Sequence, residues 1–311
     1  NEGKVQTREV LEAYGYFFEK ERNYERTILT ISNYDQTSRE NKANLIVSGK
    51  YFDKIQNGCY QINSSFALMD ESFIGIGNKD TPFNGVLDGN VNGAISTIFI
   101  ASSTSEQSDK IYRGLFQVTG ENAVIRNINI RSSFGVSANS STPATDIYVG
   151  GIAGQINNSI LSNVDVLARI AVDSTSANIY AGCIAGELIG GLDHNRNVKL
   201  NGKDSTFILS TNDQGKSIYA GLISGNATNV YVKEANADVS NFAISANNTS
   251  SSTYNANTNV YLGNLFGKFT ATEMIPIENV KINGTEKETL TSLMSSGNSY
   301  IGGLMGHLTV N

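Results

Sequence analysis

A tyrosine–glycine motif recurs along the last two-thirds of the chain and constrains the fold more than any other feature. It reads [apolar or Ser]-Tyr-x-Gly-x-[Ile/Leu]-x-Gly. A degenerate first copy, IYRGLFQV (111–118), keeps Tyr112 and Gly114 but lacks the last Gly. A unit of this size cannot bury its apolar face alone, so we expect the copies to stack on one another. The complete copies are IYVGGIAG (147–154), IYAGCIAG (179–186), IYAGLISG (218–225), VYLGNLFG (260–267) and SYIGGLMG (299–306).

Each unit of about 30–40 residues also carries further short apolar stretches. An Asn-led motif follows each of the first five copies, and a third stretch such as ARIAV (168–172) follows several of these. Three short strands per unit, with no helical segment between them, predict an all-β fold in which parallel strands coil into a β-helix. The Asn-led motifs are NINI (127–130), NVDV (163–166), NVKL (197–200), NVYV (229–232) and NVKI (279–282); insertions are expected at turns 132–146, 187–196, 246–259 and 284–298.

The N-terminal region has a different pattern. Residues 3–26 are rich in charge and place apolar side chains near helical spacing, which predicts one amphipathic helix. A stacked coil exposes an unpaired strand edge at each end, so we expect this helix to cap the first edge. The predicted organisation is a cap helix and first strand over 1–32, followed by a β-helix over 33–311 with repeat rungs from about 111 to 306.

Composition separates this chain from several protein classes. Asn, Ser and Gly make up about one third of the residues, which is typical of disorder, but 14 Tyr and 13 Phe favour an ordered chain with polar turns. The net charge of −6 argues against nucleic acid and anionic membranes as partners. No apolar run approaches the roughly 18–20 residues of a membrane helix, so no membrane insertion is expected. The absence of an initial Met suggests a fragment of a longer protein.

The segment 58–90 and the repeat copies resemble a family. GCYQINSSFALMDESFIGIGNKDTPFNGVLDGN (58–90) resembles the entry segment of bacterial surface proteins with GLUG repeats, and the Gly-x-[Ile/Leu]-x-Gly copies are similar to the GLUG repeat itself. The resemblance implies a right-handed parallel β-helix in a secreted or wall-anchored protein. Such proteins include adhesins and immunoglobulin A proteases, whose zinc-binding HExxH is absent from this sequence. A narrower resemblance is to the tapirins, which are cellulose-binding adhesins.

The sequence offers no catalytic constellation, and we expect no catalytic residue, metal site or cofactor. Acidic residues are scattered, and Asp165 with Arg169 is the best local acid–base pair. His194 and His307 are assigned to surface positions rather than to acid–base chemistry. Cys183 stands at a repeat position that other copies fill with Gly, Leu or Asn, so a small packed residue is favoured over a nucleophile.

The candidate ligand-binding residues are aromatic. An exposed tyrosine ladder would suit stacking on sugar rings, whereas an internal ladder would be structural. Each motif Tyr shares strand parity with the following Gly and Ile or Leu, which favours the internal ladder unless a bulge changes the register. Inserted loops then become better binding sites. The candidates are Tyr148, Tyr180, Tyr219, Tyr261 and Tyr300 in the ladder, Tyr254 in the loop 246–259, and Phe134 in the segment 132–146.

The sequence therefore predicts a non-catalytic extracellular domain of a bacterial surface protein that binds polysaccharide such as cellulose. A flat β-helix face and inserted loops would carry many weak contacts in parallel. Two alternatives stay open, a structural stalk or protein-binding module of a large secreted protein and a β-helix polysaccharide lyase or glycosidase. The asparagines at the head of the second motif are expected to stack within a turn and bond along the axis: Asn127, Asn163, Asn197, Asn229 and Asn279.

Overall fold

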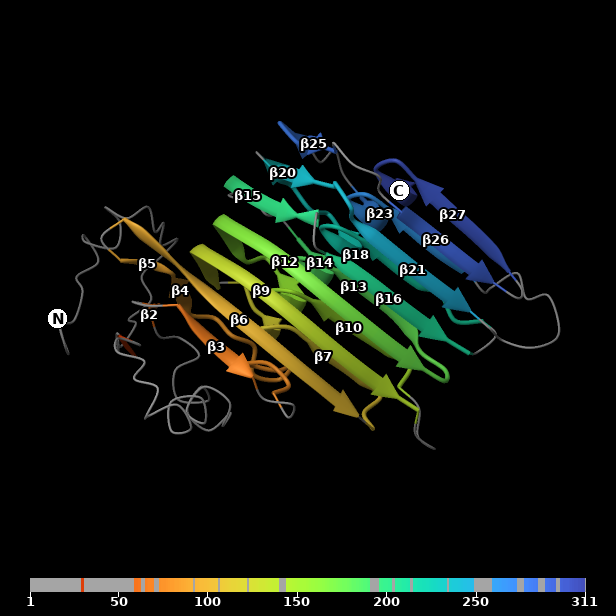
Figure 1. Cartoon of the computed structure of the whole chain (residues 1–311), viewed down its shortest axis with the longest axis horizontal. Coiled ribbons are helices and arrows are strands. Elements are labelled where there is room, and N and C mark those ends of the chain that lie inside the picture. Colours follow the sequence, from red (N-terminus) through yellow and green to blue (C-terminus); the bar gives the residue numbers. More distant parts are fainter. Residues whose placement is uncertain are drawn as a thin grey trace.

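The computed structural model is an all-β coil of parallel sheets whose strands repeat regularly along one axis, consistent with a β-solenoid (Figure 1). Its described part contains no helix, and the predicted cap helix at 3–26 lies outside it. The structure describes residues 29–30, 59–62, 65–69, 73–91, 93–105, 107–121, 123–139, 144–190, 196–202, 205–212, 215–233, 235–248, 259–272, 277–284, 289–294 and 297–310.

The largest sheet has 14 strands, and its outer face is one broad surface of the molecule (Figure 1). We call it the large sheet. Its strands pair in parallel, except for the antiparallel pair β5 and β6. Its members are β1 (Leu29–Thr30), β2 (Cys59–Gln61), β3 (Phe66–Met69), β4 (Val86–Asp88), β5 (Asn90–Val91), β6 (Ala94–Ser105), β9 (Val124–Ala138), β12 (Ile160–Ser174), β15 (Arg196–Asn201), β16 (Thr206–Thr211), β20 (Ala235–Asp238), β21 (Ala243–Asn248), β25 (Lys281–Asn283) and β26 (Thr289–Met294).

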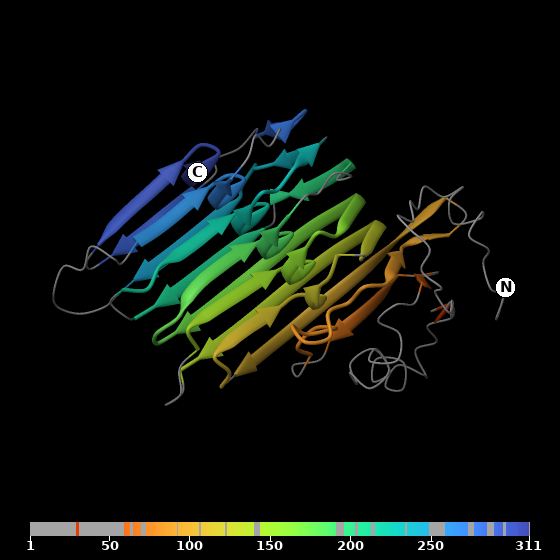
Figure 2. The same cartoon turned by 180° about the vertical axis from the view of Figure 1, so that it is seen from behind.

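Two six-stranded sheets hold the repeat motif, one strand on each side of its central Gly-x-[Ile/Leu] turn (Figure 2). The tyrosine sheet contains the Tyr-x-Gly halves: β7 (Lys110–Arg113), β10 (Asp146–Gly150), β13 (Asn178–Gly182), β17 (Ile218–Gly221), β22 (Asn259–Gly263) and β27 (Asn298–Gly302). The third sheet contains the other halves: β8 (Phe116–Thr119), β11 (Ala153–Asn157), β14 (Ala185–Ile189), β18 (Ser224–Thr228), β23 (Phe266–Ala271) and β28 (Met305–Val310). A further pair joins β19 (Val232–Lys233) to β24 (Ile277–Glu278).

The repeat copies pair in register, as the stacking argument predicts. The six motif tyrosines lie side by side on consecutive strands: Tyr112, Tyr148, Tyr180, Tyr219, Tyr261 and Tyr300. Between the sheets, apolar side chains from successive rungs form one continuous hydrophobic core. Because each rung contributes only a few such residues, burial depends on the rung above and the rung below.

Several predicted insertions are strands in the structure. Residues 132–138 continue β9, and 246–248 belong to β21. The Ser- and Gly-rich composition of 132–138 suggested a turn, but its alternate residues are buried, including Ser132 and Val136. Small polar residues here occupy a long half-buried strand rather than a loop. Residues 187–189 likewise belong to β14, and 289–294 form β26.

Asparagines turn the chain at two corners of the coil. Asn127 and Asn163 have left-handed φ values of 50° and 51°, and the Asn163 amide donates to the Asn127 side-chain oxygen at 2.9 Å. This pair confirms axial bonding at one corner. Asn229 belongs to a different corner, where its backbone position matches Asn158 and Gly190 rather than Asn163. The prediction of one ladder was wrong for Asn229 because Asn-Val also occurs at this second corner.

Candidate functional site

The tyrosine ladder lies outside the main core, on the outer side of the tyrosine sheet. The neighbours of Tyr148 in β10, Ile147 and Val149, are fully buried in the main core. Tyr148 belongs instead to a separate cluster with Tyr112 and Val118. The prediction of an internal ladder is therefore wrong.

The turn between the two motif halves is the reason for this difference. The expected inward ring requires one regular strand from Tyr148 to Ile152, but β10 ends at Gly150 and the chain turns before β11 begins. Ile152 and Ala153 are adjacent and both fully buried, so the inward–outward alternation restarts at the turn. A Cβ at Gly150 would lie 2.4 Å from the Ala185 Cα, which explains why the turn requires glycine.

The ladder rings stack face to face along the axis. Neighbouring ring centroids are 4.6–4.9 Å apart, and the ring planes differ by 3–8°. This stacking covers the faces of the inner rings, so they offer edges rather than faces to a ligand. At the two ends, the Lys79 ammonium lies 5.9 Å from the Tyr112 centroid, and Tyr300 is 42% exposed. The inner rings therefore cannot serve as platforms for sugar stacking.

A row of polar side chains from the third sheet lies beside the ladder. The Gln155 amide donates to the Glu187 carboxylate at 2.6 Å, and the Asn226 amide donates to the same carboxylate at 3.0 Å. Burial raises the pKa of Tyr148, and the negative charge of Glu187 raises it further. Burial also raises the pKa of Tyr180, and Tyr219, Asp146 and Glu187 raise it further. From Tyr112 to Tyr261 the ladder is thus a stack of hydroxyls that stay protonated at neutral pH.

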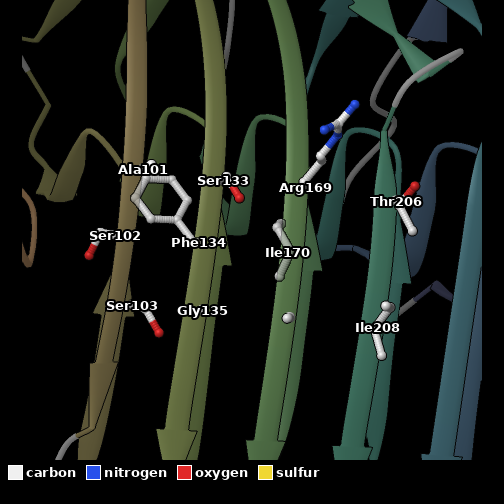
Figure 3. Close-up of a pocket in the computed structure, with 11 residues that line it drawn as sticks. Ala101, Ser102, Ser103, Ser133, Phe134, Gly135, Arg169, Ile170, Thr206 and Ile208 are labelled. Carbon is white, nitrogen blue, oxygen red and sulfur yellow. The ribbon is translucent and has the colours of Figure 1, made fainter. Parts of the chain in front are cut away.

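A hollow of about 770 Å³ opens on the outer face of the large sheet (Figure 3). Four adjacent strands line it: β6, β9, β12 and β16. Most of its side chains are small or hydroxylated, and Arg169 is the charged one among them. The lining residues are Ala101, Ser102, Ser103, Ser133, Phe134, Gly135, Arg169, Ile170, Ala171, Thr206 and Ile208.

The hollow is built from rows of outward residues aligned across the strands. One row is Ala101, Ser133, Arg169 and Thr206, and the next is Ser103, Gly135, Ala171 and Ile208. On the same face of β6, Phe99 precedes Ala101 by two residues and is 44% exposed. Sequence reasoning missed Phe99 and these rows, although the alternation of buried and exposed residues in 94–105 is visible once the strand is recognised.

Phe134 is among the residues that line the hollow, but its side chain points into the core rather than outward. Its side chain is 2% exposed and belongs to the main core, because the alternation of β9 directs Ser133 and Gly135 outward instead. The proposal that Phe134 binds ligand from a loop is corrected accordingly. Tyr254, the other loop candidate, lies outside the described residues.

The residues weighed for catalysis have structural surroundings where they are described. Asp165 pairs with Arg131 of β9 at 2.9 Å, rather than with Arg169. Cys183 is fully buried, its thiol contacts the Ser205 hydroxyl at 3.4 Å, and burial raises its pKa to about 12. The His307 ring lies edge-on to Tyr261 with centroids 5.2 Å apart. His194 lies outside the described residues.

The described residues contain no group of three or more His, Cys, Asp or Glu side chains that could hold a metal ion. They also include no helix with the length and hydrophobicity to cross a membrane.

No protein-family model matches the chain, and no curated protein or solved structure shows significant similarity to it.

Proposed function

We propose that this protein is a non-catalytic extracellular domain of a bacterial surface protein that binds polysaccharide, such as cellulose or another insoluble plant glycan. The observation that carries the proposal is the hollow on the large sheet, with its small, hydroxylated lining. The resemblance to GLUG repeats supports the location at the cell surface. In this proposal the solenoid is a right-handed parallel β-helix, the hand expected for parallel crossovers.

The chemistry of the hollow suits an uncharged sugar chain. Hydroxyls of Ser103, Ser133 and Thr206 can donate to and accept from sugar hydroxyls, while the small side chains let a flat ligand approach the sheet. Phe99 supplies an exposed ring at the N-terminal side of the hollow, where the face of a sugar can stack. None of these contacts is strong alone, so retention depends on many of them acting together.

Depletion from solution tests the proposal. The purified protein is mixed with insoluble cellulose, xylan or chitin, and the unbound fraction is measured. We expect depletion by at least one glycan and about tenfold weaker binding by Phe99→Ala, which corresponds to roughly 1.4 kcal/mol. Ile95→Ala is the matched control, because Ile95 is an exposed apolar residue on the same strand but away from the hollow. Lack of depletion by every glycan, or release of reducing ends, would contradict the proposal.

A second candidate function is a structural module that packs against another protein. Ile301, Leu304 and Leu308 are exposed on the last described rung, although the residues before them in the same rows are buried. A second copy of the chain is the simplest partner to test. Concentration-dependent mass in light scattering that Leu308→Lys abolishes, together with no glycan depletion, would favour this function over polysaccharide binding.

A further inference from the structure

The longer dimension of the hollow indicates how a ligand would lie in it. We infer that a glycan chain lies across the strands, parallel to the solenoid axis, and that Gly135 and Ala171 form the floor that admits it. The inference rests on the proposed polysaccharide binding, to which it adds an orientation and two residues that determine access.

The hollow is longer across the strands than along them. Its lining comes from four neighbouring strands, which at a spacing of about 4.8 Å span roughly 14 Å. Along each strand it takes two outward positions, such as Ser133 and Gly135, which are only about 7 Å apart. An extended chain therefore meets the most lining residues when it runs along the axis.

The two ends of the hollow along the strand direction are bounded by larger groups. On one side Phe99 projects from β6 next to Arg131, which is paired with Asp165. On the other side Asp173 is exposed on β12 and accepts a hydrogen bond from the Asn139 amide at 2.8 Å. A chain lying along a strand would have to displace one of these groups. Along the axis it crosses the small residues Ser103, Gly135 and Ala171 before it reaches Ile208, with Arg169 in the neighbouring row.

Gly135 is the lowest point of the floor, and the backbone does not require glycine there. Its φ lies outside the left-handed region. A Cβ would lie 2.9 Å from the Ser103 hydroxyl oxygen, which can rotate away, and 3.3 Å from the Ser103 Cβ, which would have to shift by a few tenths of an ångström. Glycine within a strand weakens the strand, and it is often found where a ligand approaches closely. A side chain at Gly135 should thus block the hollow without preventing folding.

Three valine substitutions on the same face test the orientation. Gly135→Val and Ala171→Val fill the floor along the axis, whereas Ser137→Val places the same valine side chain farther along β9, outside the hollow. Binding is measured by depletion with the insoluble glycan that retains the unmodified protein, and by calorimetry with cellobiose and cellohexaose. Thermal unfolding of each variant checks that the fold is intact.

We expect Gly135→Val and Ala171→Val each to weaken binding about tenfold or more, with Ser137→Val within about twofold of the unmodified protein. Cellohexaose should bind more tightly than cellobiose, because it reaches all four strands. Equal loss in Ser137→Val and Ala171→Val would overturn the axial orientation. Full binding by folded Gly135→Val or Ala171→Val would overturn the floor assignment while the proposed function stands. Failure of the unmodified protein to bind any glycan would instead overturn the proposed function.

Discussion

Single asparagine side chains determine where this chain changes direction. Asn127, Asn163 and Asn279 combine a left-handed backbone with a short amide side chain. Most residues avoid that conformation, and Asn adopts it at low cost because its amide can bond locally. The Asn127 amide in turn donates to Asp88 at 3.0 Å, and Asp88 is paired with Arg126. At this corner, side-chain hydrogen bonds therefore connect successive rungs along the axis.

Asn163 allows the backbone contribution to be separated from the hydrogen bond. Both Asn163→Ala and Asn163→Gly lose the 2.9 Å bond to Asn127, but only alanine is strained at a φ of 51°. We expect Asn163→Ala to lower the free energy of unfolding by about 2 kcal/mol, and Asn163→Gly by about half as much. Urea unfolding monitored by circular dichroism measures the difference. Equal effects of the two substitutions would show that backbone strain does not matter there.

Sequence reasoning recognised these asparagines as turn residues but not which corner each occupies. Asn163 and Asn229 are both followed by Val, and nothing local distinguishes them. The pairing of strands does: Val164 pairs with Val198 in the large sheet, whereas the backbone N–H of Asn229 donates to the carbonyl of Thr270 in β23 of the third sheet. Information of this kind belongs to the neighbouring rung and cannot be read from one copy.

At the scale of an element, each motif is two strands joined by a turn that restarts the alternation. Sequence periodicity predicted the two strands of each motif and their stacking correctly, because apolar spacing is a local property. It could not predict the side on which Tyr148 lies, since that depends on how sharply Gly150 and Gly151 turn the chain. The turn places a second, smaller aromatic cluster outside the main core.

The ladder gives the protein an alkaline dependence of stability. Burial raises the pKa of Tyr112, Tyr148, Tyr180, Tyr219 and Tyr261 above the ordinary value of about 10. As pH rises above 10, the unfolded chain loses these protons before the folded chain does, so the free energy of unfolding falls. Ladder stabilisation is complete below pH 10. Chemical unfolding at pH 8, 10 and 11 should show the decline.

Absorbance at 295 nm provides an independent measurement of the same property. In the folded protein a set of tyrosines should ionise only above pH 10, and unfolding should shift their titration to the ordinary value. The control is Tyr180→Phe, which keeps the stack but removes one titrating hydroxyl. Complete ionisation of the folded protein near pH 10 would contradict the burial of the ladder hydroxyls.

For the whole molecule, stability depends on the contact of each rung with its two neighbours. The rows are continuous through the core, yet Leu308 and Val310 of β28 are exposed where no described rung covers them. Sequence reasoning predicted the coil as a whole from its repeats. It did not predict the hollow, because four rungs contribute to it and each contributes only small residues without a distinctive pattern.

One row of the third sheet tests this dependence on neighbours. Phe269 and Leu308 pair at equivalent positions, but Phe269 is 3% exposed and Leu308 is 56% exposed. We expect Phe269→Ala to lower the free energy of unfolding by about 3 kcal/mol, and Leu308→Ala by less than about 0.5 kcal/mol. Thermal and urea unfolding measure both. A comparable loss in the two variants would mean that Leu308 is covered in solution.

The in-register rows also allow different residues to be compared at equivalent positions of successive rungs. At the turn of the motif, Gly151, Cys183, Leu222 and Asn264 follow one another through backbone hydrogen bonds between rungs. The same backbone position therefore holds residues that range from glycine to leucine, because the side chains that face it differ from rung to rung. A Cβ at Gly151 would lie 2.8 Å from a side-chain carbon of Val166. At the equivalent position, the Cys183 thiol instead contacts the Ser205 hydroxyl. Tolerance at any position in this coil is set by the atoms that face it, both in its own rung and in the neighbouring rung.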